Sequence, residues 1–206
     1  MGLIFLIVFL VVCLPGLCGY VAENGRSPRL QKIAASHNWH YVSRAWLTKS
    51  QQVGVRNVLK GHIKSIEAKI FDMGSVPAYE QIYIEPEHVH WHAHTTYLLL
   101  TLPGCALPRF HLFPKTWLDQ WTNLGMSCRN FTVYGDDVVR LQEQFAGAWR
   151  EHYEQQRGLH IRTIGKHVLL WFDADDYYLP ATKELYGDLM GEGKIVLDVL
   201  GELMAE

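Results

Sequence analysis

The segment LHIRTIGKHVLLWF, residues 159–172, decides how the strands of this chain pair. Two short runs rich in apolar residues, Leu159 to Ile164 and His167 to Phe172, flank the dipeptide Gly165-Lys166. A two-residue loop that contains glycine and separates two strand-like runs predicts a β-hairpin. Because a hairpin joins antiparallel neighbours, we expect an antiparallel sheet around it.

Other segments add strands and helices without a regular alternation of the two. Strand composition is found in Trp39 to Ser43, His62 to Asp72, His88 to Leu102 and Leu107 to Pro114. Helical spacing is found in residues 27–38, 138–156 and 180–204, the last with breaks at Gly191 and Gly193. The sequence therefore predicts an α+β fold, a mainly antiparallel sheet with flanking helices, preceded by one N-terminal transmembrane helix.

The predicted transmembrane helix is the apolar start of the chain. Residues 1–22 carry no charged side chain and are mostly Leu, Ile, Val and Phe. A helix needs about 20 apolar residues to cross a hydrocarbon core roughly 30 Å thick, a length that this run reaches only with Pro15-Gly16 included. We expect residues 1–22 to be a membrane anchor and residues 23–206 to be a single α+β domain.

A cleaved secretory signal is the main alternative for this segment. Leu3 to Cys13 has the right length for a signal core, and Pro15-Gly16 could end the helix ahead of a cut after Cys18. Against this, no Lys or Arg precedes Arg26, whereas a secretory signal normally opens with positive charge. A third alternative is a hydrophobic arm buried in a partner protein.

The charges that follow the segment bear on which side of the membrane the domain occupies. Arg26, Arg29 and Lys32 come directly after it, and positive charge near a membrane end favours the cytoplasmic side. If the segment is retained, we expect a cytoplasmic domain. A cleaved signal would instead make residues 23–206 a soluble periplasmic or secreted domain.

Composition excludes several other classes of protein. With 19 basic and 21 acidic side chains the net charge is −2, so we expect no nucleic-acid partner. Cys105 and Cys128, outside the apolar run, could form a disulfide only in an oxidising compartment. In a cytoplasmic domain we expect both to be reduced, buried and apolar in behaviour.

Four short motifs follow one another along the chain. They are Leu30-x-x-x-Ala34-x-x-x-Asn38-Trp39-x-Tyr41, Gly61 ahead of a strand ending in Phe71-Asp72, Leu107-Pro108-x-Phe110-x-Leu112-x-Pro114, and Tyr134-Gly135-Asp136-Asp137. In this order the chain resembles a loose group of uncharacterised bacterial proteins with an N-terminal transmembrane segment. It departs from them at Lys115, where an acidic residue is usual, and in its histidine-rich strand. The resemblance implies a domain anchored in the bacterial inner (cytoplasmic) membrane and transfers no site residues.

The most unusual local pattern is the alternation of four histidines, His88, His90, His92 and His94, with other residues. On a strand all four would face the same way, with successive ones roughly 6.6 Å apart. Two such histidines can share a transition metal ion if a neighbouring strand supplies a third ligand, for which His62 and His111 are candidates. The alternatives are a solvent-facing strand in which histidine is simply tolerated, and a pH-sensitive patch.

No other motif fixes a reaction. Tyr134-Gly135-Asp136-Asp137 spells the tetrapeptide of RNA-polymerase palms, but a predicted helix follows, so we interpret its aspartates as a helix cap. We therefore expect a non-catalytic, membrane-anchored binding domain with a protein partner, for which Trp117 and Trp121 offer an exposed patch. The alternative is a metal-binding protein or metal-dependent enzyme that uses the strand from His88 to His94.

Fractionation combined with N-terminal sequencing tests the anchor. If residues 1–22 are retained, the full chain stays with the membranes after a high-salt wash, because the apolar segment is held by lipid rather than by charge. Mature protein that begins near Gly19 and remains in the soluble fraction contradicts this prediction. Protease protection of the same membranes reports which side the domain occupies.

Overall fold

One antiparallel sheet dominates the structure, a computed structural model that describes residues 26–46, 54–73, 95–104, 107, 109–115, 126–135, 148–156, 158–173 and 183–204. Its nine strands are β1 (His40–Trp46), β2 (Gly54–Ile63), β3 (Ile66–Met73), β4 (Thr95–Thr101), β5 (Phe110–Pro114), β6 (Met126–Ser127), β7 (Phe131–Gly135), β8 (Leu159–Ile164) and β9 (His167–Phe172). The helices among the described residues are residues 26–36, α4 (Ala148–Gln155) and α5 (Lys183–Met204).

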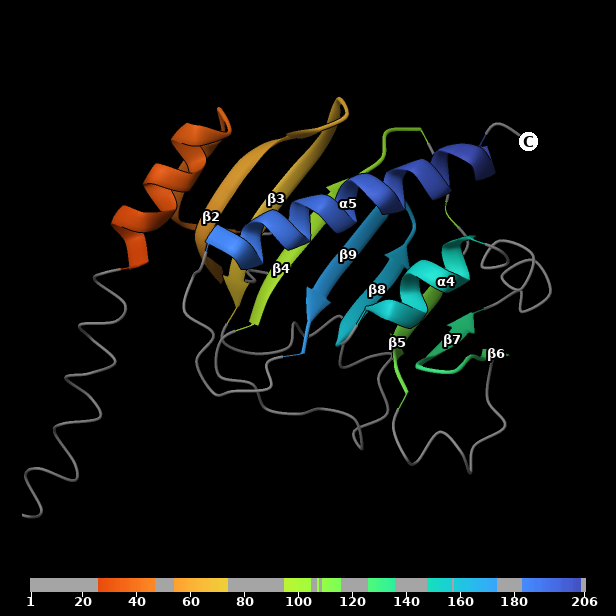
Figure 1. Cartoon of the computed structure of the whole chain (residues 1–206). Coiled ribbons are helices and arrows are strands. Elements are labelled where there is room, and N and C mark those ends of the chain that lie inside the picture. The colour runs from red at the N-terminus through yellow and green to blue at the C-terminus, as the bar shows by residue number, and fades with distance from the viewer. Residues whose placement is uncertain are drawn as a thin grey trace, which may run out of the picture.

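The β8–β9 hairpin lies inside the sheet and joins its two parts (Figure 1). The strand order is β1-β2-β3-β4-β9-β8-β5-β7-β6, so β9 pairs with β4 and β8 pairs with β5. The hairpin predicted from residues 159–172 is confirmed, with Ile164 opposite His167. Gly165 has a φ of 59°, a conformation that glycine adopts without strain.

All three described helices lie on one face of the sheet, which we call the helix face (Figure 1). Leu30 of the first helix, Tyr153 of α4 and Tyr186 of α5 belong to the same buried cluster as Leu98 and Leu170 of the sheet. The opposite face, which we call the second face, has a smaller apolar cluster: Val55, Val58, Phe71, Tyr97 and Leu169. The middle strands are therefore apolar on both faces.

The fold class expected from the sequence, α+β with flanking helices preceded by one N-terminal transmembrane helix, is wrong. The described residues form mostly an antiparallel sheet, with few helices, all of them on a single face. None of these helices is both long and apolar enough to span a membrane. Residues 1–22, where the sequence predicts the anchor, lie outside the described residues.

One of the strands that the sequence does not predict, β2, precedes a turn that lacks the usual turn residues. Residues 54–73 form the β2–β3 hairpin, whereas the sequence predicts a single strand from His62 to Asp72. Its loop is Lys64-Ser65, with φ values of 48° and 68°. Positive φ at both positions is typical of a type I′ turn, for which Asn and Gly are the usual residues. Lys and Ser in these positions give no turn signal.

The predicted breaks in the last helix are also absent, since α5 runs unbroken through Gly191 and Gly193. A Cβ at Gly193 would lie 2.7 Å from Cδ2 of Leu98 and 3.2 Å from Cδ1 of Ile63. Glycine at this position therefore lets the helix lie close against β2 and β4. Close packing on the sheet outweighs the low helix propensity of glycine.

A buried polar network fastens the first helix to the sheet. Nη2 of Arg26 donates to Oδ1 of Asp72 at 2.7 Å, and Oγ1 of Thr96 donates to the same oxygen at 2.8 Å. Nδ2 of Asn57 donates to Oδ2 of Asp72 at 2.9 Å. Three donors surround a carboxylate that is only 5% exposed, so its burial is compensated on both oxygens.

The end of the first helix places a tryptophan ring against a glycine of β2. Just after the helix, Asn38 has a φ of 55°, and the Trp39 N–H donates to the carbonyl of Ala34 at 2.7 Å. This is the αL termination common at helix C-termini. A Cβ at Gly61 would lie 2.4 Å from the Trp39 ring. Two of the motif residues quoted above, Trp39 and Gly61, therefore form one contact between helix and sheet.

Replacing Gly61 with alanine tests this contact. The added Cβ overlaps the Trp39 ring, so we expect Gly61→Ala to lower the free energy of unfolding of the full chain by about 1–3 kcal/mol. Gly187→Ala is the matched control, because no atom lies within 4 Å of its Cβ position. In a helix this change should raise stability by about 0.5–1 kcal/mol. Chemical denaturation measures both, and equal effects of the two substitutions contradict the contact.

Candidate functional site

The structure does not bring the two candidate third ligands for a metal together. His62 is exposed on β2 and His111 is half-buried on β5. Five strand spacings separate β2 from β5, which is about 24 Å across the sheet. In the part of the chain that the structure describes, no three His, Cys, Asp or Glu side chains are arranged to hold a metal ion. His88, His90, His92 and His94 lie outside it, as do Trp117 and Trp121, so these predictions stay predictions.

The structure instead groups five rings on the second face, which we call the histidine–aromatic cluster: His111, Phe113, Tyr134, His160 and Trp171. His160 stacks on Trp171, with ring centroids 4.6 Å apart and planes 10° apart. The His111 ring lies 5.0 Å from Phe113, 5.7 Å from His160 and 5.6 Å from Trp171. Phe113 stacks on Tyr134 at 5.2 Å. All five side chains are half-buried.

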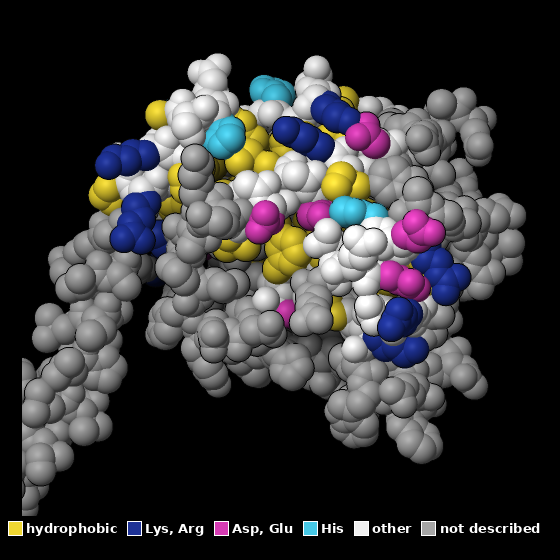
Figure 2. Space-filling model, viewed as in Figure 1, with side chains coloured by type: hydrophobic (Ala, Val, Ile, Leu, Met, Phe, Trp, Pro, Cys, Tyr) yellow, Lys and Arg dark blue, Asp and Glu magenta, His cyan; other side chains and the backbone are white. Residues whose placement is uncertain are grey.

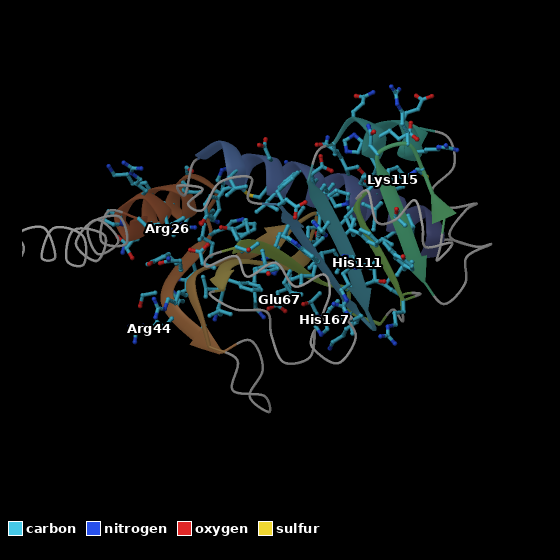
Figure 3. All side chains as sticks on the ribbon, turned by 90° about the horizontal axis from the view of Figure 1, so that it is seen from below. Arg26, Arg44, Glu67, His111, Lys115 and His167 are labelled. Atoms are coloured by element: carbon cyan, nitrogen blue, oxygen red, sulfur yellow. The ribbon has the colours of Figure 1, made fainter. Side chains whose placement is uncertain are left out.

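Strand register explains why these rings meet. Trp171 lies opposite His160 on β8 and opposite Tyr97 on β4. His111 lies opposite Tyr134 on β7 and opposite Arg162 on β8. Paired residues in an antiparallel sheet point to the same face, so the rings form a row across neighbouring strands. Figure 3 shows His111, His167 and Glu67 on the side of the sheet away from α5.

An acidic residue at the end of β9 orients one of these rings. Oδ1 of Asp173 lies 2.8 Å from Nε2 of His160, and a carboxylate only accepts, so Nε2 is the donor. The backbone N–H of Asp173 donates to the carbonyl of Gly158 at 2.6 Å. Gly158 has a φ of 70°, and a Cβ there would lie 3.3 Å from Asp173. This backbone contact closes the open end of the hairpin and fixes the carboxylate beside the imidazole.

Among the described residues, Nδ1 of His160 is buried and has no hydrogen-bond partner. It is an acceptor when Nε2 carries the proton of a neutral ring. Oγ1 of Thr132, on a side chain that is only 2% exposed, likewise has no partner among the described residues. Thr132 pairs with Phe113 across β5 and β7. Buried polar atoms are almost always satisfied, so both atoms are exceptions to the usual pattern.

Among the described residues, no hydroxyl or thiol is hydrogen-bonded to His160. Cys128 belongs to the core of the helix face, where burial raises the pKa of its thiol. A buried thiol with a raised pKa is unreactive.

The polar groups of the helix face hold helices together. Nε2 of His152 on α4 lies 3.0 Å from Oε2 of Glu192 on α5, a carboxylate that is almost fully buried. Burial, with the Glu192 carboxylate nearby, raises the pKa of Tyr153 well above its usual value. Figure 2 shows Lys and Arg side chains over residues 26–36, over α4 and at the upper edge between them. The His152–Glu192 contact links α4 to α5.

Sequence reasoning missed His160, Trp171 and Asp173, although a signal for the first two was present. Once Gly165-Lys166 is accepted as a two-residue loop, Ile164 lies opposite His167. Counting back along both strands then places His160 opposite Trp171 on one face. The sequence gives no such signal that His111 lies near His160, because tertiary packing decides that β8 and β5 are neighbours.

Comparisons with known proteins give one informative match. No protein-family model matches the chain, and no curated protein matches its sequence. The fold is similar to the crystal structure of the mycobacterial trehalose monomycolate transport factor A, TtfA, with a TM-score of 0.58 and 13% sequence identity. The match covers 85% of this chain and 96% of the other. At this identity the similarity establishes a shared fold.

His167, on the second face of the sheet, should make the stability of the protein depend on pH. Burial, together with the charges of Lys166 and Lys69, lowers the pKa of this imidazole, whose Nδ1 lies 3.3 Å from Oγ1 of Thr101. Below about pH 6.5 the unfolded chain therefore takes up a proton more readily than the folded one, and stability is lost as the pH falls toward the lowered pKa.

We expect His167→Gln to remove part of this loss. The free energy of unfolding should decrease less for the variant than for the natural chain between about pH 7.5 and pH 5.5. His37→Gln, at an exposed position, is the control. An unchanged pH slope in His167→Gln shows that His167 does not contribute.

Proposed function

We propose that this chain is a non-catalytic binding protein of a lipid-transport system, held at a membrane by its apolar residues 1–22. The observation that carries the proposal is the fold shared with a trehalose monomycolate transport factor over 96% of that chain. Trehalose monomycolate is a sugar joined to a long acyl chain, so the transport in which that factor takes part is of an amphipathic lipid.

The binding surface we propose is the histidine–aromatic cluster. Aromatic side chains dominate the energetics of binding surfaces because each presents a large rigid area with few torsions to order. The cluster spans β9, β8, β5 and β7, so it includes the hairpin that joins the two parts of the sheet. Strands in such a position hold their side chains more rigidly than loops do. The face opposite is already covered by helices.

The first helix supports attachment of the domain at a membrane. It begins at Arg26, so residues 23–25 connect it to residue 22, and three residues reach at most about 11 Å. Arg29 and Lys32 are exposed on this helix, where they would face the anionic lipids of a cytoplasmic leaflet. The ion pair of Arg26 with Asp72 would then transmit the position of the anchor to the sheet.

Site-specific photocrosslinking of the full chain in its native membranes tests this function. A benzophenone amino acid at Phe113 should form discrete adducts with a lipid or with a membrane protein of the transport system. The same probe at Lys194, exposed on α5, is the control and should give few adducts. Equal adducts at both positions, or none at either, would falsify the proposed binding surface. Mass spectrometry identifies what is bound.

A further inference from the structure

We infer that residues 24–66, which we call the basic segment, form a surface that binds the anionic phospholipid headgroups of the membrane next to residues 1–22. This inference rests on the proposed function, which holds the chain at a membrane. It adds the class of lipid that the domain recognises and the side chains that recognise it. The observation that carries it is a separation of charge along the chain, which the fold gathers at one end of the sheet.

The basic segment contains eight Lys and Arg side chains and no Asp or Glu. The remaining residues contain 11 Lys and Arg and all 21 Asp and Glu. These counts include every residue of the sequence, so the net charge of −2 combines a strongly positive segment with a strongly negative remainder. Clusters of about four to eight Lys and Arg directly after a transmembrane helix are typical of binding to anionic lipids.

The fold places the basic segment at one end of the sheet. It includes the first helix, β2 and the edge strand β1. The first helix packs on this end, because Leu30 and Leu59 of β2 belong to the same buried cluster. Figure 3 shows Arg26 and Arg44 at this end of the sheet, and Figure 2 shows Lys and Arg side chains over the first helix. Basic side chains of the segment therefore come together from a helix and an edge strand.

Two exposed arginines of this end lie opposite each other on β1 and β2. Arg44 pairs with Arg56, and Arg56 pairs with Asp72 on β3. Cross-strand partners point to the same face, so both arginines are on the face of Asp72, whose carboxylate already accepts from Arg26. Like charges directly opposite each other are unfavourable in a sheet. An anionic headgroup beside Arg44 and Arg56 would reduce that repulsion.

Arg29 and Lys32 extend this surface along the first helix. Both are exposed and three residues apart, so they are neighbours on one face of the helix. In the part of the chain that the structure describes, neither side chain has an ion pair or a hydrogen bond.

The distance to the proposed anchor favours lipid as the anionic partner. Residues 23–25, which join residue 22 to the first helix, reach at most about 11 Å. This is close to the Debye length of about 8 Å at physiological salt, so the charges of a membrane surface would still act on the start of the helix. A nucleic acid or an acidic protein would have to compete with a surface that is always within reach.

Lysine footprinting of the full chain in lipid nanodiscs tests the inference. In discs of phosphatidylcholine with phosphatidylglycerol, an amine-reactive reagent should modify Lys32 at a rate lower by about threefold or more than in discs of phosphatidylcholine alone, because anionic headgroups cover the side chain. Lys194, exposed on α5, is the internal control and should react equally in both. High salt should remove the protection of Lys32, since it screens exposed charges. Mass spectrometry measures both rates.

A matched pair of double variants assigns the protection to the basic segment. Arg29→Gln combined with Arg44→Gln should remove most of the protection of Lys32 in the anionic discs. Arg129→Gln combined with Lys166→Gln is the control, because it removes the same charge from exposed positions outside the segment. It should leave the protection unchanged. The comparison of the two lipids uses the natural chain, so it stands even if a variant does not fold.

Equal modification of Lys32 in the two kinds of disc overturns the inference, as does an equal effect of the two double variants. Protection of Lys32 by a DNA oligonucleotide in neutral discs, without protection by phosphatidylglycerol, also overturns it and assigns the surface to nucleic acid. A chain that associates with anionic discs but not with neutral ones contradicts the anchor of the proposed function while it supports the inference. A chain that is anchored in both but leaves Lys32 unprotected does the reverse, so the two proposals can fail separately.

Discussion

The antiparallel pairing of β4 with β9 is the interaction on which the rest of the structure depends. It joins the strands β1 to β4 to the hairpin β8–β9, and through the hairpin to β5, β7 and β6. Leu98 and Leu170 face the helices from this pair, while Tyr97 and Trp171 face the other way. Both faces of the pair are largely buried, so a slip of one residue would exchange the two sets and lose both cores.

The same register builds the histidine–aromatic cluster. Trp171 stands between Tyr97 and His160 only because β9 is inserted between β4 and β8, and the Asp173 carboxylate follows where β9 ends. The order of the strands in the sheet therefore brings these rings together. No continuous sequence motif does so. The backbone hydrogen bonds of the sheet therefore fix the relative positions of these side chains.

In the function proposed above, the helix face would serve attachment and the second face would serve binding. The helix face carries the first helix, fastened by Arg26 and Asp72 and by the packing of Trp39 on Gly61. A buried ion pair of this kind is weak evidence of net stability, but breaking it leaves a charge in an apolar place. It therefore fixes where the helix sits.

The sequence by itself determined the local elements whose signals are short-range. The loop Gly165-Lys166 specified the central hairpin, and the spacing of Leu30, Ile33 and Ala34 specified the first helix. The sequence does not predict the Lys64-Ser65 turn, because the neighbouring strands impose positive φ values that these two residues do not normally prefer. Only the tertiary structure decided that β8 pairs with β5, which brings His111 to His160, and that all three described helices share one face. The strand order and the placement of the helices depend on the total burial from many contacts between residues that are distant in the chain. No local sequence pattern indicates that total.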